Sequence, residues 1–137
     1  MVGVVLSQLI NPGTCIILGG VQAPLDMYRA IYSYGAPELN PLCGGLTEMA
    51  KFCGIPMFGT SGCTDTKTME IQSGIEAALS IHTSMLTGAN FVHDNGYTES
   101  GKTGDIFQTV MDDEIISMSR IIEQGIEISD ESLATDI

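Results

Sequence analysis

The pair His93-Asp94 has the clearest chemical potential in the sequence, because it closes a short apolar run and is followed by Asn95-Gly96-Tyr97. An imidazole moves protons near neutral pH, and a carboxylate beside it can orient the ring. The carboxyl ends of parallel strands carry the site in α/β folds, so a strand-end histidine would stand over such a site. A strand-end histidine with purely structural hydrogen bonds is the alternative.

A second candidate is the loop 59–65 (GTSGCTD), which carries more small polar groups than a connection requires. Cys63 could be a nucleophile only with a neighbouring base or positive field. A polar loop that lines a pocket is the interpretation we favour. Gly19 and Gly20 close an earlier apolar run, where they either let a ligand approach the backbone or form a tight turn.

Tyrosines gather in or near the predicted loops. Aromatic faces and nearby carboxylates hold quaternary ammonium ions, so these residues would suit a cationic substrate. Ordinary amphipathic packing is the alternative. The four are Tyr28, Tyr32, Tyr34 and Tyr97.

Composition and missing motifs exclude several classes of protein. With 17 acids, five bases and a formal net charge of -12, the chain is a poor candidate for binding nucleic acid or anionic membranes. It carries no G-x-G-x-x-G, P-loop or G-x-S-x-G motif. The four cysteines form no C-x-x-C pair, so no zinc site is expected. The absence of a signal peptide or long apolar run predicts a cytoplasmic protein with reduced thiols and no membrane segment.

Alternating strands and helices would position these residues. Buried strands are predicted at 14–19, 55–59 and 89–93, with helices at 36–52, 68–87 and 106–124. A period of about 35–40 residues is typical of the βα repeat of a parallel sheet. Three repeats are too few for a closed (β/α)8 barrel of about 250 residues. The pattern therefore predicts either roughly half a barrel or a small open sheet.

The helical periodicity also predicts which faces are buried. A stripe on the second predicted helix contains Ile71, Ile75, Ala78, His82 and Met85. A stripe on the third contains Phe107, Met111, Ile115, Met118 and Ile122. The acidic run 112–114 is expected to be solvated near the start of that helix. His82 is expected to be a core or interface histidine rather than a ligand.

Eight segments together resemble the trimethylamine methyltransferase family, which comprises corrinoid-dependent methyltransferases and includes glycine betaine methyltransferases. They occur in the family's order and cover nearly the whole chain. The segments are 7–13 (SQLINPG), 18–20 (LGG), 33–38 (SYGAPE), 59–67 (GTSGCTDTK), 72–78 (QxGxEAA), 88–90 (GAN), 93–97 (HDxGY) and 112–116 (DDEII).

The resemblance implies a TIM barrel, of which this chain would be a single internal to C-terminal fragment spanning 1–137. It implies methyl transfer from a tertiary or quaternary amine to the cobalt of a corrinoid (cobalamin) held by a partner protein. No cofactor would be bound covalently to this chain. Trimethylamine enzymes of the family carry pyrrolysine, and its absence from this sequence favours betaine-like substrates. The alternative is that a fragment omits that position.

The same resemblance suggests roles for particular residues. His93 and Tyr97 are the candidate catalytic residues. Asp65 and Asp94 would orient groups or balance charge in the substrate site. The remaining candidates are Tyr34 and Glu38 for the substrate cation, and Gly19, Gly20, Ser61 and Gly62 for the corrinoid.

The resemblance leaves two states of the chain open. It could act as part of a methyltransferase, together with a chain that supplies the missing half of the barrel. Alternatively, it could be an inactive half barrel that only binds or associates. Because an open half barrel leaves unpaired strand edges and uncovered apolar surface, we expect a homo-oligomer.

Overall fold

A three-stranded parallel sheet forms the centre of the computed structural model, which describes residues 2–129 and 131–133. Its strands are β1 (Leu18–Gly19), β4 (Met57–Thr60) and β5 (Phe91–His93), in that spatial order. The central strand β4 pairs with β1 through Leu18 and Met57 and with β5 through Thr60 and His93. The strands are neighbours in the order in which they occur along the chain, as in a barrel segment. The parallel α/β organisation is thus confirmed, and it is consistent with a partial α/β barrel.

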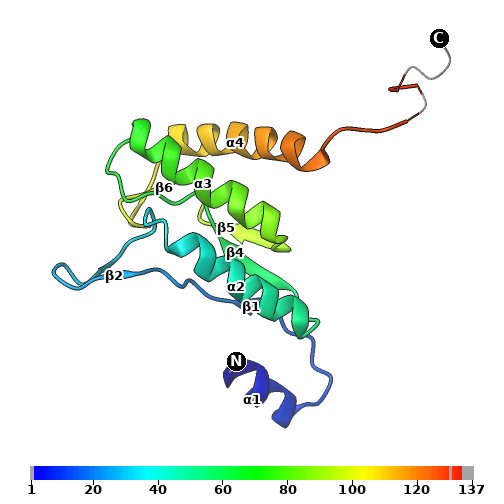
Figure 1. Cartoon of the computed structure of the whole chain (residues 1–137). Helices are drawn as coiled ribbons and strands as arrows, with labels where there is room; N and C mark the ends of the chain where they lie inside the picture. Colours follow the sequence, from blue (N-terminus) through cyan, green and yellow to red (C-terminus); the bar gives the residue numbers. More distant parts are fainter. Residues whose placement is uncertain (1, 130, 134–137) are drawn as a thin grey trace.

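Each strand of the sheet is followed by a helix (Figure 1). These are α2 (Leu39–Phe52), α3 (Ile71–Thr87) and α4 (Ile106–Gln124). Helices α2 and α3 pack against β4 and against each other, and α4 packs along α3. The predicted bounds of α4 hold, whereas α2 and α3 each begin three residues later than expected and end where predicted. The start of α3 is fixed by a capping box, in which Glu70 and Ser73 bond to each other's backbone.

One helix and two β-hairpins are present that the sequence pattern does not predict. Helix α1 (Val2–Ile10) precedes the sheet and buries none of its residues. The connection between β1 and α2 contains a hairpin of β2 (Leu25–Asp26) and β3 (Ile31–Tyr32). The connection between β5 and α4 contains a second hairpin, β6 (Tyr97–Thr98) and β7 (Thr103–Gly104).

The three predicted strands are shorter than expected. The run 14–19 contributes only Leu18–Gly19 to the sheet, and 89–93 contributes only Phe91–His93. The run 55–59 becomes Met57–Thr60. After α4, a last turn or helix starting at Ser129 or Asp130 is a further expectation from the sequence. The N–H of Leu133 donates a hydrogen bond to the carbonyl of Ser129, and Asp130 lies outside the described residues.

The predicted buried faces of α3 and α4 are right only in part. Ile115 is buried, and Ala78, Met85 and Met111 pack against the core cluster as expected. Ile71, however, remains 85% exposed, and Phe107, Met118 and Ile122 are exposed as well. The residues that face inward are mostly small or polar: Ser73, Ala77, Ser80, Ile81 and Ser84 on α3, and Gln108, Asp112, Ile115 and Ser119 on α4. Two of these serines have polar partners. The hydroxyl of Ser80 accepts a hydrogen bond from the N–H of Gly62 at 3.0 Å, which satisfies a backbone group of the loop above the sheet, and Ser73 caps its own helix.

The apolar core is divided into two clusters. Leu18, Ala50 and Met57 form one cluster between the sheet and α2. Ala77, Ile81 and Ile115 form the other between α3 and α4. The opposite face of the sheet is open, since Phe58 and Phe91 are 41% and 54% exposed. Within the described part of the chain, no helix is both long and apolar enough to cross a membrane.

Candidate functional site

The Asp65 carboxylate joins the three connections that follow the strands. Its Oδ1 atom accepts hydrogen bonds from the backbone N–H of Tyr34 and the hydroxyl of Ser100, both at 2.8 Å, and its Oδ2 atom accepts one from the hydroxyl of Ser33. Ser33 and Tyr34 belong to the connection after β1, Asp65 to that after β4, and Ser100 to that after β5. We call this arrangement the Asp65 clip.

Glu76 on α3 binds the loop that carries Asp65. Its Oε2 atom accepts from the hydroxyl of Thr64 at 2.5 Å and from the N–H of Asp65 at 3.0 Å. A Cβ atom at Gly35 would overlap the Glu76 carboxylate. Only glycine therefore lets the connection after β1 lie against this carboxylate. Two acidic side chains thus hold the loops with their hydrogen-bonding oxygens occupied.

His93 lies at the end of β5 with both ring nitrogens in polar contacts. Nδ1 is 2.7 Å from Oδ1 of Asp94, and Nε2 is 3.2 Å from the hydroxyl of Thr60. The two contacts suit a ring that donates from Nδ1 to Asp94 and accepts at Nε2 from the Thr60 hydroxyl. The imidazole stacks on the ring of Phe58 with centroids 4.5 Å apart. The orientation of His93 by Asp94 is the arrangement that the sequence suggested.

The backbone of Asp94 has a positive φ of 76°, which is uncommon for a residue other than glycine. The neighbouring Gly96 also has a positive φ, and its N–H donates to Oδ2 of Asp112 at 2.7 Å. Gln108 donates to the other oxygen of Asp112 at 2.8 Å. The loop that carries Asp94 is therefore fixed to α4 by a carboxylate.

Asp112 was expected to be solvated, and that prediction is wrong. Its side chain is 1% exposed because it faces the loop after β5, whereas Asp113 and Glu114 point to solvent as expected. Burial raises the pKa of Asp112, although the hydrogen bonds from Gly96 and Gln108 partly oppose the increase. The helical pattern gave no sign of this position, since Asp112 serves a loop and not the apolar core.

The carboxylates of Asp94 and Asp65 lie near Cys63 in the interior of the site. Cys63 is 2% exposed, and burial, followed by the carboxylates of Asp94 and Asp65, raises its pKa to about 12. The pKa of Tyr34 is raised by burial and then by Asp94. Cys63 is thus a neutral thiol at neutral pH, which argues against a nucleophilic role. The same carboxylates that disfavour a thiolate would favour a cation.

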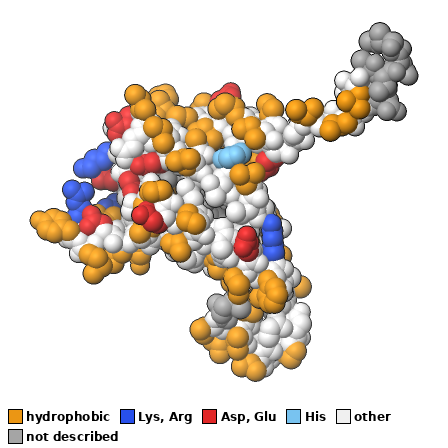
Figure 2. Space-filling view, viewed as in Figure 1, with side chains coloured by type: hydrophobic (Ala, Val, Ile, Leu, Met, Phe, Trp, Pro, Cys, Tyr) orange, Lys and Arg blue, Asp and Glu red, His pale blue; other side chains and the backbone are white. Residues whose placement is uncertain are grey.

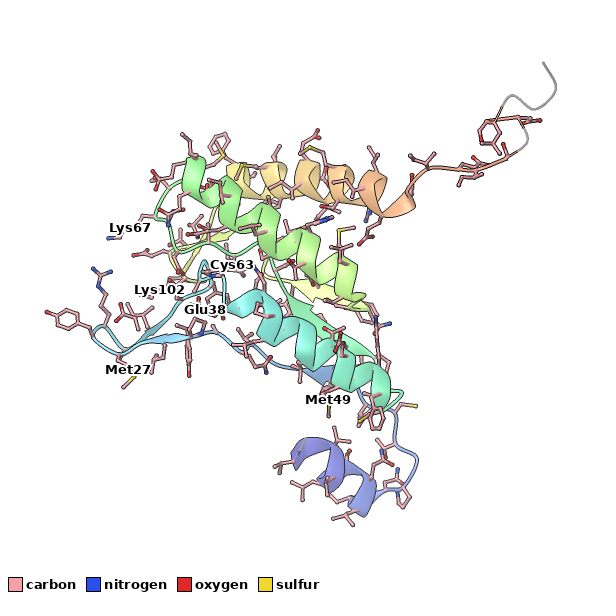
Figure 3. All side chains as sticks on the ribbon, viewed as in Figure 1. Met27, Glu38, Met49, Cys63, Lys67 and Lys102 are labelled. Atoms are coloured by element: carbon pink, nitrogen blue, oxygen red, sulfur yellow. The ribbon has the colours of Figure 1, made fainter. Side chains whose placement is uncertain are left out.

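The other aromatic and acidic candidates differ in their position and exposure. Tyr97 is partly exposed at the start of β6, and its carbonyl accepts from the N–H of Thr64 at 3.0 Å. Glu38 is exposed at the N-terminus of α2, at the same end of the molecule as Cys63 (Figure 3). Tyr32 is exposed on β3, and Tyr28 lies at the tip of the hairpin, away from the site.

The four residues suggested for corrinoid contact have different surroundings. Gly19 is exposed and pairs with Phe58 in the sheet, and a Cβ at Gly20 would lie 2.8 Å from Nε2 of Gln22. Ser61 is buried, and its N–H donates to the carbonyl of His93 at 3.1 Å. Gly62 is buried with a φ of 79°. Ser61 and Gly62 therefore shape the loop, whereas Gly19 is accessible.

Together these features describe an α/β protein whose strand ends carry an acidic site bordered by aromatic rings. The chain belongs to the trimethylamine methyltransferase (MTTB) family, which its residues 1–137 match. This confirms the family resemblance read from the sequence.

Two curated relatives match almost the whole chain. Trimethylamine methyltransferase MttB of Methanosarcina thermophila is 32% identical over 134 residues, which cover 98% of this chain and 28% of that protein. Glycine betaine methyltransferase of Desulfitobacterium hafniense is 33% identical over 138 residues, which cover 100% of this chain and 29% of that protein. The chain thus spans a little over a quarter of the length of these relatives.

Proposed function

We propose that this chain contributes three βα units of a TIM barrel that transfers a methyl group from a tertiary or quaternary amine to the cobalt of a corrinoid protein. The proposal is supported by family membership and by relatives named for trimethylamine and glycine betaine. The parallel strands in sequential order suit a segment of such a barrel.

The observation that carries the proposal is the group of carboxylates at the strand ends. Burial is the largest cause of the raised pKa of the Cys63 thiol and of the Tyr34 phenol, and nearby carboxylates add to it: Asp94 and Asp65 for Cys63, and Asp94 for Tyr34. The carboxylates that disfavour a thiolate or phenolate would stabilise a positively charged group in the same place. A methylated ammonium group, which cannot donate hydrogen bonds once it is quaternary, is held by such carboxylates and by aromatic faces. Tyr34 and Tyr97 would supply those faces.

The residues of this chain would act mainly by positioning. Holding the N-methyl group in line with its acceptor removes much of the entropic barrier to transfer. His93, fixed by Asp94, Thr60 and Phe58, would border the reacting end of the site together with Tyr97. Glu38 would balance charge at the rim.

The corrinoid would supply a cobalt nucleophile that accepts the methyl group. Gly19 is the residue whose surroundings best fit its close approach, since it is exposed and has no side chain. Ser61 and Gly62 would contribute indirectly by fixing the loop after β4.

A methyl-transfer assay tests the proposal. The chain is coexpressed with the part of the D. hafniense glycine betaine methyltransferase that it does not match, then incubated with cob(I)alamin and a [13C-methyl]-labelled amine. We expect labelled methylcobalamin from glycine betaine or trimethylamine. Asp94→Asn should lower the rate about tenfold or more, whereas the exposed Asp113→Asn should leave it unchanged. Absence of label with both amines would contradict the proposal.

The second candidate, a chain that acts by self-association, is favoured by the open face of the sheet. Phe58 and Phe91 lie side by side on it with ring centroids 6.5 Å apart. Pairing of two such faces would remove apolar surface from water. Light scattering should then show a dimer or larger species at micromolar concentration, and a monomer would contradict association.

A further inference from the structure

Three aromatic rings lie together on the open face of the sheet, and we call them the aromatic layer. Phe58 on β4 is paired in register with Phe91 on β5, and their ring centroids are 6.5 Å apart. His93 lies two residues beyond Phe91, and its ring stacks on Phe58 with centroids 4.5 Å apart and an angle of 22° between the ring planes. Side chains alternate along a strand, and Met57 packs against α2, so the three rings point to the side of the sheet that the helices leave uncovered (Figure 1).

The aromatic layer has an open edge next to β1. Gly19 pairs with Phe58, and a Cβ atom at Gly19 would lie 3.7 Å from Cβ of Phe58. A larger residue at this position would therefore lie against the Phe58 side chain, whereas glycine leaves that side of the ring free. The opposite side of the molecule, where the helices face the viewer in Figure 2, instead mixes hydrophobic side chains with acidic and basic ones.

His93 contributes the face of its ring to this layer and not a free nitrogen atom. Its Nδ1 and Nε2 atoms are engaged by Asp94 and Thr60, and its side chain is 31% exposed. The faces of aromatic rings carry partial negative charge, and Asp94 places a carboxylate at the edge of the layer. Both features suit a cation that has no hydrogen bond to donate.

We propose that Phe58, together with Phe91 and His93, forms the aromatic floor of a site for a quaternary methylammonium group. The inference rests on the proposed function, to which it adds the residues that would select charged methyl groups, beneath Tyr34 and Tyr97 of the loops. The methyl groups of such an ion share its positive charge and pack on aromatic faces. A cation is the occupant because a carboxylate adjoins the rings, and a second copy of this chain would bring a net charge of -12 towards that carboxylate.

Titration of the 13C,15N-labelled chain with tetramethylammonium chloride, followed by NMR, tests the inference, with NaCl as the matched salt. We expect saturable binding, an upfield shift of the methyl protons, and nuclear Overhauser effects from these protons to the rings of Phe58 and Phe91. These effects are measured on the wild-type chain and do not depend on any variant. Phe58→Leu, which keeps an apolar side chain but removes the ring, should weaken binding about fivefold. Phe58→Tyr, which keeps the ring, should bind like wild type.

Phe52→Leu is the matched control, because Phe52 is an exposed phenylalanine at the end of α2, and it should bind like wild type. Absence of saturable binding, Overhauser effects to Tyr34 and Tyr97 alone, or equal weakening in Phe52→Leu would overturn the inference. A dimer that Phe58→Leu converts to a monomer, with no Overhauser effect from the methyl protons, would also overturn it by identifying a second copy as the occupant. Binding at Phe58 without methyl transfer in the coexpression assay would reject only the proposed function.

Discussion

Removal of the Asp65 carboxylate should destabilise the chain, because three connections lose a shared hydrogen-bond acceptor. Hydrogen bonds to a charged group contribute about 1.5–3 kcal/mol each. The hydroxyls of Ser33 and Ser100 are only partly buried and can turn to water, whereas the N–H of Tyr34 loses its partner. We therefore expect Asp65→Ala to lower the free energy of unfolding by about 2–4 kcal/mol, less than the sum of three bonds.

Urea denaturation followed by circular dichroism measures this change. Asp65→Asn keeps an acceptor but not the charge, so it should lose about half as much as Asp65→Ala. Asp113→Ala, an exposed acid on α4, should stay within about 0.5 kcal/mol of wild type. If Asp65→Ala unfolds at the same urea concentration and with the same slope as wild type, the clip does not hold the loops and the reasoning is refuted.

Three other properties follow from the same packing. Because the pKa of Asp112 is higher in the folded chain than in the unfolded chain, the folded chain loses stability as pH rises from the unfolded pKa of about 4 through the folded pKa. Asp112→Asn cannot ionise, so its free energy of unfolding relative to wild type should increase with pH over this range. Denaturation curves of both proteins at several pH values measure the difference. With its pKa raised to about 12, Cys63 should resist DTNB at pH 8 until the chain unfolds, while the two exposed cysteines react at once. Gly96→Ala should cost about 2 kcal/mol or more, because φ is positive and the Cβ would overlap Thr109, whereas Gly104→Ala meets no neighbour and should cost much less.

The sequence predicts the parallel α/β order well because that order depends on local signals. Short apolar runs bounded by glycine mark β1, β4 and β5, and Gly88 and Gly125 mark the ends of α3 and α4. The same logic places His93 beside Asp94 at a strand end, since both follow from one strand. Strand length was overestimated because apolar residues such as Ile16 and Ile17 precede β1 without pairing in the sheet.

The inward helix faces and the Asp65 clip depend on contacts that a local pattern does not contain. Ser33 and Ser100 are far apart in the chain, and nothing in either residue indicates that one carboxylate binds both. Asp112 appeared solvated because it lies within an acidic run, although its partner is a backbone N–H of a distant loop. Ser80 and Asp112 thus face inward because each accepts a hydrogen bond from a backbone N–H of a loop above the sheet.

The central claim is that the strand ends bind a methylated cation. It is tested most directly by titrating the 15N-labelled chain with glycine betaine and, separately, with 3,3-dimethylbutanoate, which has the same shape but a carbon in place of the charged nitrogen. We predict saturable amide shifts at Tyr34, Cys63 and Asp94 with glycine betaine and none with the isostere, which keeps the carboxylate but lacks the positive charge. Equal shifts with both compounds, or no shifts with either while the chain is folded, would contradict the account.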